Sequence, residues 1–232
     1  QFIRVEGETR SNMNILADNG YVTEILEPGP LVEEEQLEQF LALYETLIEE
    51  CEIVVISGSI GRGIPEDIYK TLIGKARFKG LRTMLDASGE SLRAGMEAKP
   101  YFVKPNQKEL EYIVGHKLVN REDLIEAALK VHAGGIAHVV VSMGKNGLLY
   151  VCSGGVALYA KAENIQAVNT VGCGDCVVAS YAMSFMKKDR REEALRRAAA
   201  ISAANATTLK SADVPFGTAE ELYERITVEK LR

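Results

Sequence analysis

The chain has 232 residues and a formal net charge of −6, with 47% hydrophobic and 26% charged residues. This composition is typical of a globular protein, and the interspersed charges argue against nucleic acid or an anionic membrane as the main partner. No apolar run approaches the length of a membrane span, no secretory signal is visible, and four scattered cysteines do not suggest a disulfide framework. We therefore expect a cytoplasmic protein with one large domain.

The first 30 residues predict β-structure. Segments 2–7, 12–17 and 21–26 alternate apolar and polar residues, and the sequence DNG at 18–20 favours a turn between the last two. Such alternation is typical of a sheet with one solvated face. We interpret residues 1–30 as an appendage outside the main sheet.

Helices and strands alternate along the rest of the chain. An amphipathic helix is predicted over 33–50, and the apolar run 53–58 is typical of a buried parallel strand. Pro65 suits the first turn of the next helix. The pattern then predicts strands at 82–87, 101–105, 138–144 and 147–153, and helices at 89–98, 106–114, 120–134, 175–188, 191–210 and 218–226, the last with a Thr218/Glu221 capping box. This alternation predicts an α/β fold over 31–232, a mostly parallel sheet between two layers of helices.

Small or polar residues follow the predicted core strands. They are Gly58-Ser59, Asp86, Lys104-Pro105-Asn106 and Ser142-Met143-Gly144. Ligands of open α/β sheets bind beyond the carboxyl ends of the strands, so we expect these residues near the site.

The segment NTVGCGDCVV at 169–178 allows two interpretations. A turn formed by Gly172, Cys173 and Gly174 at a helix start would leave the N–H groups of 172–174 unpaired, which suits a phosphate. Asp175 would then lie beside that anion and accept a proton from a hydroxyl nucleophile. The alternative is that the glycines only form a turn and that Asp175 is an ordinary acid at a helix N-terminus.

The same segment contains Cys173 and Cys176 at the spacing of a redox dithiol or half a zinc site. Cys51 and Cys152 have no partner nearby in the sequence, and the three histidines (His116, His132 and His138) show no ligand spacing. We therefore favour Cys173 as a small turn residue and Cys176 as a buried helix residue.

Two further stretches suit nucleotide chemistry, although no P-loop is present. Asn106 and Glu109 stand three residues apart at a helix start, so they could hold Mg²⁺ through water. Simple N-capping by Asn106 is the alternative. The segment SMGKNG at 142–147 would let backbone approach a nucleotide, or it is an ordinary hairpin turn.

Four stretches resemble one family, the PfkB or ribokinase-like carbohydrate kinases, in that family's order. NTVGCGD resembles the signature D-T-x-G-A-G-D, KPNQKEL the N-x-x-E region, VVVSMGKNG the S-x-G-x-x-G loop, and VVISGSIGRGIPEDIY the segment S-G-S-x-x-x-G-x-P. GETRSNMNI followed by TEILEPGP looks like the branch that acts on phosphorylated ketohexoses, which includes 1-phosphofructokinase and tagatose-6-phosphate kinase.

The resemblance implies a ribokinase-like three-layer fold and ATP-dependent phosphorylation with Mg²⁺. It implies that Asp175 is the catalytic base and that Gly172, Cys173 and Gly174 form the anion hole. The other implied roles are nucleotide binding by Ser142, Gly144, Gly147 and Asn205, substrate binding by Arg10, Asn12 and Ser59, and metal binding, through water, by Asn106 and Glu109. Residues 1–30 would belong to a β lid that covers the sugar and often mediates dimers.

Two departures from the family pattern affect these expectations. Asn169 stands where the signature usually has an Asp that helps to bind a monovalent cation, which puts K⁺ dependence in doubt. The chain starts at QFIRVEGETR without Met, and the family's first strand and G-G-K-x-x-N loop are not in it. We therefore expect this chain alone to be poor at catalysis and less stable than an active, longer parent protein.

Several functions remain open. Fructose 1-phosphate is the favoured acceptor, with tagatose 6-phosphate or another sugar of this family as alternatives. Arg10 argues against ribose or nucleoside kinases, whose acceptors carry no phosphate. A non-catalytic nucleotide-binding relative and a thiol-redox protein are the more distant alternatives.

Overall fold

The computed structural model describes residues 1–16, 22–162 and 164–232. Its main sheet has the strand order β3-β4-β5-β6-β7-β8-β9. The strands are β3 (Ile53–Ser57), β4 (Arg82–Asp86), β5 (Phe102–Val103), β6 (His138–Ser142), β7 (Leu148–Cys152), β8 (Val156–Ala160) and β9 (Val228–Lys230). Strands β3 to β6 are parallel neighbours, as predicted, whereas β6 to β9 are antiparallel.

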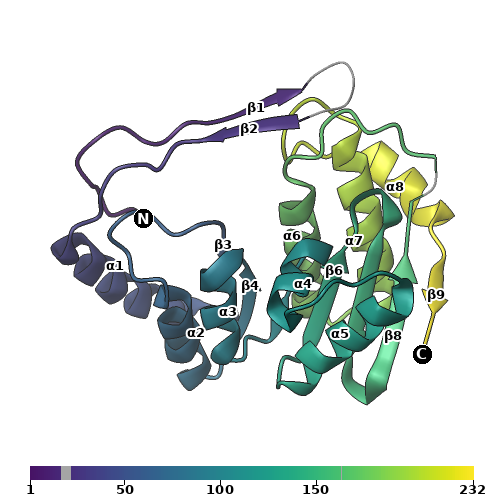
Figure 1. Cartoon of the computed structure of the whole chain (residues 1–232), viewed down its shortest axis with the longest axis horizontal. Coiled ribbons are helices and arrows are strands. Elements are labelled where there is room, and N and C mark those ends of the chain that lie inside the picture. Colours follow the sequence, from purple (N-terminus) through teal and green to yellow (C-terminus); the bar gives the residue numbers. More distant parts are fainter. Residues whose placement is uncertain (17–21, 163) are drawn as a thin grey trace.

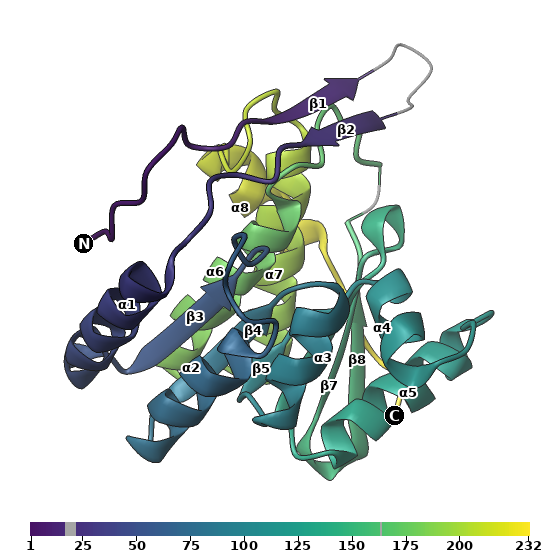
Figure 2. The same ribbon diagram turned by 60° about the vertical axis from the view of Figure 1, so that its left-hand side comes forward.

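Two layers of helices cover the sheet (Figure 1, Figure 2), which confirms the predicted three-layer α/β fold. One layer consists of α1 (Glu34–Leu47), α2 (Ile68–Phe78), α3 (Gly89–Glu97), α4 (Gln107–Val114) and α5 (Arg121–Ala133). The other consists of α6 (Cys173–Lys187), α7 (Arg191–Ala206) and α8 (Phe216–Arg225). No helix in the described residues is both long and apolar enough to cross a membrane.

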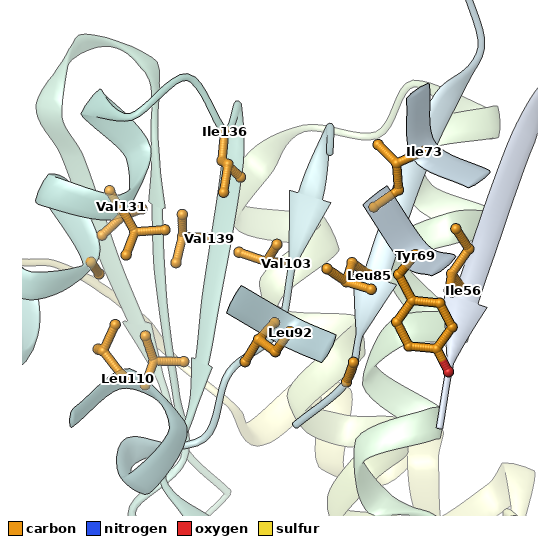
Figure 3. Packing of buried hydrophobic residues seen from close by; sticks show 14 of the residues in the cluster. Ile56, Tyr69, Ile73, Leu85, Leu92, Val103, Leu110, Val131, Ile136 and Val139 are labelled. Carbon is orange, nitrogen blue, oxygen red and sulfur yellow. The ribbon is translucent and has the colours of Figure 1, made fainter. Parts of the chain in front are cut away.

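Each layer encloses its own apolar core. On the α1–α5 side, Leu85 and Val103 of the sheet pack near Ile73 and Leu92 of the helices, and all four are almost completely buried (Figure 3). A second cluster joins the opposite face to α6, α7 and α8. Burial on both faces explains why the parallel strands appear in the sequence as continuous apolar runs.

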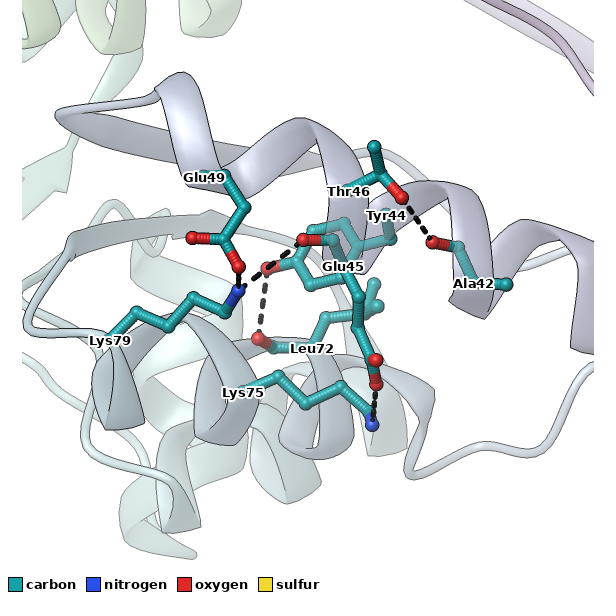
Figure 4. Close-up of polar contacts among 8 residues, drawn as sticks. All are labelled: Ala42, Tyr44, Glu45, Thr46, Glu49, Leu72, Lys75 and Lys79. Atoms are coloured by element: carbon teal, nitrogen blue, oxygen red, sulfur yellow. Dashed lines mark hydrogen bonds and ion pairs between the residues drawn. The ribbon is translucent and has the colours of Figure 1, made fainter.

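Helix α1 joins the N-terminal segment to the core by packing on α2 (Figure 4). The hydroxyl of Tyr44 donates to the Leu72 carbonyl at 2.9 Å, and burial raises the pKa of Tyr44 to about 12. Ion pairs of Lys75 with Glu45 and of Lys79 with Glu49 flank this contact. Because these charges are solvated, the buried tyrosine contributes more to holding α1 in place.

A two-stranded antiparallel hairpin, β1 (Asn12–Leu16) and β2 (Val22–Leu26), extends over one end of the core (Figure 1, Figure 2). The predicted turn at 18–20 lies outside the described residues. The prediction of a strand at 2–7 is wrong, since this segment forms no strand and the Phe2 side chain is 94% exposed. Among the described residues no segment pairs with it, and an extended chain without a ladder partner gains no strand hydrogen bonds.

Four predicted helix boundaries need correction. Helix α2 begins at Ile68 rather than Pro65, because the Ile68 N–H closes a turn on the Pro65 carbonyl first. Helix α6 begins two residues earlier than predicted, at Cys173. Helix α7 ends at Ala206 instead of 210. Helix α8 begins at Phe216, so Thr218 lies inside the helix and the predicted capping box does not form.

The antiparallel half of the sheet was not predicted beyond β7. Strand β8 follows β7 through the short 3₁₀ turn η3 (Ser153–Gly155), and β9 adds at the edge by pairing Val228 with Ala160. Connections this short join only antiparallel strands. The sheet therefore changes from parallel to antiparallel pairing after β6, where no helix connects one strand to the next.

Candidate functional site

A cavity of about 580 Å³ lies at the end of the sheet where α6 begins. Its walls come from the loops after β5 and β6, the segment after β8, the start of α6 and one side of α7. The lining residues are Asn106, Ser142, Gly144, Lys145, Gly147, Leu148, Lys161, Ala162, Asn164, Ile165, Ala167, Thr170, Cys173, Gly174, Val177, Ala199, Ser202, Ala203 and Ala206. Four of the predicted nucleotide and metal residues, Asn106, Ser142, Gly144 and Gly147, therefore share one cavity with the glycine turn.

The connection between β6 and β7 is both a hairpin and a wall of this cavity. It contains the 3₁₀ turn η2 (Gly144–Asn146), and Gly147 has a φ of +86°. A Cβ at Gly147 would lie 2.3 Å from the Ala160 carbonyl oxygen, so only glycine fits there. Both interpretations of SMGKNG, a hairpin turn and a close backbone approach, are thus compatible.

The glycine turn at the start of α6 differs in one detail from the prediction. Gly172 adopts a left-handed φ of +82°, and a Cβ there would lie 2.8 Å from the Ala212 backbone nitrogen. The Cys173 N–H donates to the Thr170 carbonyl at 3.3 Å, so it is used inside the turn rather than free. The N–H groups of Gly174 and Asp175 belong to the first helical turn, which provides them with no intrahelical acceptor.

Asp175 lies beyond this turn with an exposed side chain. The Ser57 hydroxyl, at the end of β3, donates to Asp175 Oδ1 at 3.5 Å. Because Gly174 lines the cavity and Asp175 contacts the end of β3, the carboxylate lies where the cavity and the β3 loop meet.

The loop after β3 also holds Arg10. The Arg10 guanidinium donates to the Ser59 hydroxyl at 2.8 Å, and the Gly58 carbonyl accepts from Tyr69 at 3.1 Å. The predicted pair Arg10 and Ser59 is therefore brought together, two residues from Ser57. Asn12 is not brought to this loop, since it pairs with Leu26 in the hairpin.

An ion pair that the sequence interpretation missed lies under the turn. Lys104 Nζ is 3.1 Å from Asp86 Oδ1, and the two side chains are only 7% and 16% exposed. A Cβ at Gly174 would lie 3.1 Å from Lys104 Nζ. Burial raises the pKa of Asp86, although the Lys104 ammonium opposes this rise. Asp86 ends β4 and Lys104 follows β5, so their positions at the ends of strands predicted that they lie near the site but not that they form an ion pair.

Asn106 and Glu109 form a capping box at α4, which confirms the capping interpretation. The Glu109 N–H donates to Asn106 Oδ1 at 2.9 Å, and the Asn106 N–H donates to Glu109 Oε2 at 2.8 Å. Burial raises the pKa of Glu109. Within the described ranges no cluster of three or more His, Cys, Asp or Glu could hold a metal.

Asn205, predicted to contact the nucleotide, is fully buried and is not among the residues that line the cavity. Its Nδ2 donates to the Val171 carbonyl at 3.0 Å and to Cys173 Sγ at 3.3 Å. It holds the turn from below because α7 packs directly against α6.

Asn169 joins the turn to the loop after α7. Its Nδ2 donates to the Leu209 carbonyl at 2.9 Å, and its Oδ1 accepts from the Val171 N–H at 3.0 Å. A carboxylate at this position would face the Leu209 carbonyl without a proton between them and would need a cation there. The carboxamide makes this contact directly, without an ion between the two groups.

The cysteines are all free, which leaves the C-x-x-C without a disulfide. Burial raises the pKa of the Cys176 thiol to about 11. Cys173 Sγ donates to the Ser202 carbonyl at 3.3 Å. A buried thiol that stays protonated is a poor redox nucleophile, so burial favours a packing role for Cys176, whereas Cys173 is partly buried and hydrogen-bonded to α7.

Comparisons with known proteins agree with this geometry. The family model described as "pfkB family carbohydrate kinase" matches residues 1–215. The 1-phosphofructokinase of Haemophilus influenzae is 36% identical over 203 residues, which is 88% of this chain and 65% of that protein. The 1-phosphofructokinase of Vibrio cholerae is 34% identical over 221 residues, covering 95% of this chain and 68% of that protein.

Solved structures show the same architecture. A "possible 1-phosphofructokinase" from Thermotoga maritima superposes with a TM-score of 0.88 at 28% identity, covering all of this chain and 74% of the other. Phosphofructokinase-2 from Escherichia coli in complex with potassium gives a TM-score of 0.83 at 29% identity, covering 94% and 71%. The chain thus spans about two thirds to three quarters of the length of these relatives.

Proposed function

The chain belongs to the pfkB family of carbohydrate kinases, and we propose that it transfers the γ-phosphoryl group of ATP to a hydroxyl of a phosphorylated ketohexose, with fructose 1-phosphate as the leading acceptor. The observation that carries this proposal is the position of Asp175. Its backbone neighbour Gly174 lines the cavity, while its carboxylate contacts Ser57, two residues before the Ser59 hydroxyl that binds Arg10.

ATP would occupy the cavity with its phosphates toward the start of α6. The N–H groups of Gly174 and Asp175 and the helix dipole stabilise negative charge there. The lining is mostly small or apolar along α7, with Ala199, Ala203 and Ala206, which suits a flat base. Asn106 and Glu109 would hold, through water, Mg²⁺ carried by the phosphates, which offsets the charge of the transferred group.

Asp175 would act as the base in the transfer step. The acceptor hydroxyl gives its proton to the carboxylate as its oxygen attacks the γ-phosphorus, and the bond to the ADP oxygen breaks. The Lys104 ammonium under Gly174 adds positive charge close to the place where the phosphoryl charge develops.

Arg10 would bind the phosphate already present on the sugar. A guanidinium pairs with phosphate in bidentate geometry, and its contact with Ser59 orients it from the core side. Asn12, on β1, would contact the acceptor from the hairpin. This arrangement favours a phosphorylated acceptor over a free sugar or a nucleoside.

The identity of the acceptor rests on the relatives. Two curated relatives are named 1-phosphofructokinase, which favours fructose 1-phosphate. Phosphofructokinase-2 of Escherichia coli has been solved in complex with fructose-6-phosphate at 29% identity and a TM-score of 0.79, which makes fructose 6-phosphate a second candidate. Tagatose 6-phosphate remains the third.

The test is an ADP-release assay on the protein that carries this sequence, with MgATP and each of the three sugar phosphates. We expect turnover on fructose 1-phosphate and a loss of about 10²–10⁴-fold in Asp175→Asn, the usual contribution of a general base. Cys173→Ala is the matched control in the same turn and should retain most activity. Nucleotide binding without turnover on any acceptor would instead favour a non-catalytic relative.

We also propose a homodimer that forms through the hairpin, in a reducing cytoplasm. Met13, Ile15 and Ile25 lie on one face of β1–β2 and are 58%, 47% and 51% exposed. A pairing of such faces would bury them, and four free cysteines suit a reducing compartment. Sedimentation of the wild type against Met13→Lys tests the dimer, because a buried lysine at this face should shift the protein to monomer.

A further inference from the structure

Asn205 is a polar residue in an otherwise apolar stretch of α7. It is 0% exposed, and its neighbours Ala204 and Ala206 are buried alanines. Both N–H bonds of the carboxamide point to the glycine turn, one to the Val171 carbonyl at 3.0 Å and one to Cys173 Sγ at 3.3 Å. Asn205 Oδ1 has no hydrogen-bond partner among the described residues.

An unpaired buried oxygen is costly, so stability alone does not account for an asparagine here. A side chain of similar shape without polar atoms would avoid that cost but would leave the Val171 carbonyl without this donor. The contact therefore has a local consequence: it fixes the backbone immediately before Gly172. A third contact, from the Cys173 thiol to Ser202, ties the same turn to α7 one helical turn earlier.

Helix α7 is also a wall of the cavity, through Ala199, Ser202, Ala203 and Ala206. The same helix thus contacts the space for the nucleotide on one side and the turn that carries Asp175 on the other. We propose that Asn205 is a positioning residue, whose hydrogen bond to the Val171 carbonyl holds the turn where the Gly174 N–H and the Asp175 carboxylate can contact the phosphoryl group. This inference rests on the proposed phosphoryl transfer.

The experiment compares Asn205→Leu with Asn205→Asp, which are close to asparagine in size. Leucine donates no hydrogen bond at any pH. A buried aspartate without a cation nearby has a raised pKa, and its neutral form offers one O–H that can donate to the Val171 carbonyl. The titratable group in contact with this side chain is the Cys173 thiol, which is the same in both variants and in the wild type.

Each variant is measured as a ratio to wild type, for kcat with the accepted sugar phosphate and for ADP affinity by calorimetry. We expect Asn205→Leu to lower kcat by about 10–100-fold at all pH values, with the sugar-phosphate KM changed less than about twofold, since a small misplacement of catalytic groups has this effect. The Asn205→Asp ratio should be equally low near pH 8 and should recover several-fold toward about pH 6 as the carboxyl becomes protonated.

A flat Asn205→Asp ratio, or a change in sugar-phosphate KM instead of kcat, would overturn the positioning role. Thermal unfolding of each variant tests whether it is folded at the assay temperature. If Asn205→Leu is not folded, the pH response of Asn205→Asp alone tests the positioning role. If the wild type binds ADP but transfers no phosphate, the proposed function fails separately. In that case the ADP affinities of the variants test the positioning role of Asn205. We expect the affinity of Asn205→Asp, relative to wild type, to recover toward about pH 6 as its kcat ratio would.

Discussion

Lys104 Nζ lies 3.1 Å from Asp86 Oδ1, directly under Gly174 of the turn that begins α6. The two residues come from the ends of the neighbouring parallel strands β4 and β5. A buried ion pair is weak evidence for stability, because desolvation of both charges offsets much of their attraction. Its position under the turn that we propose to bind phosphate suggests a functional reason for keeping two charges there.

Removing one charge of this pair should be more harmful than removing both. In Lys104→Met, Asp86 would remain buried without its cation, and we expect a loss of about 3–5 kcal/mol in the free energy of unfolding. The double variant Asp86→Asn/Lys104→Met should recover a large part of that loss. Urea unfolding of the three proteins measures this difference.

Lys75→Met is the matched control for this prediction. Its partner Glu45 is on the solvated surface between α1 and α2, so the loss of stability should be much smaller. Equal losses in Lys104→Met and Lys75→Met would show that the pair under the turn is not energetically distinct. The double variant should still lack transfer activity, because the positive charge near the phosphoryl group is gone.

Gly172 and Gly174 should differ in their response to alanine. At Gly172, a φ of +82° and the Ala212 nitrogen at 2.8 Å both oppose a Cβ, and we expect Gly172→Ala to cost more than about 1 kcal/mol. At Gly174 the closest atom is the flexible end of Lys104, at 3.1 Å. Gly174→Ala should therefore remain stable but lose transfer activity as the ammonium is displaced. Chemical unfolding and the ADP-release assay, applied to both variants, separate these effects; the reverse ranking in stability would contradict the prediction.

Glu109 should make the stability of the protein depend on pH in the acid range. Burial raises its pKa above the ordinary value of 4.5, so the folded state binds this proton more tightly than the unfolded state. The contribution of Glu109 to stability is therefore largest below the ordinary pKa and declines as the pH rises toward the raised pKa. Glu109→Gln keeps an oxygen that can accept from the Asn106 N–H but does not titrate.

We expect the difference in unfolding free energy, wild type minus Glu109→Gln, to fall as the pH rises through this window. Urea unfolding at a series of pH values gives this difference, and the other titrating groups cancel between the two proteins. A difference that rises with pH would mean that Glu109 is stabilised as a carboxylate by Lys104 rather than destabilised by burial.

The parallel half of the sheet was predictable because each of its strands is a short apolar run and each crossover helix has the helical period. Strand β9 was not predictable, because the short segment Val228–Lys230 has little of the composition or alternation that is typical of strands. Its pairing depends on β8, almost seventy positions earlier in the chain, and such long-range pairing leaves no local trace.

The candidate site, like the sheet, was predictable only in part. The glycines of the turn and of the β6–β7 hairpin stand out because their backbone conformations require them. The hydrogen bond of Asn205 to the Val171 carbonyl was not predictable, because the position of Asn205 in the sequence does not show that α7 buries it against the turn. Asp86 and Lys104 were recognised as residues at strand ends, but only the strand order makes them neighbours.

Arg10 should determine affinity for the phosphorylated acceptor without affecting the nucleotide. It is exposed, contacts Ser59 and is not among the residues that line the cavity. Arg10→Met should raise the KM for the sugar phosphate by about 10–100-fold, the usual contribution of a charge-assisted hydrogen bond, and leave the KM for ATP nearly unchanged. Arg4→Met, an exposed arginine of the same segment, is the matched control and should change neither constant. If Arg10→Met raised the KM for ATP instead, the acceptor phosphate would have to bind elsewhere, and the hairpin side of Asp175 would not be the acceptor side.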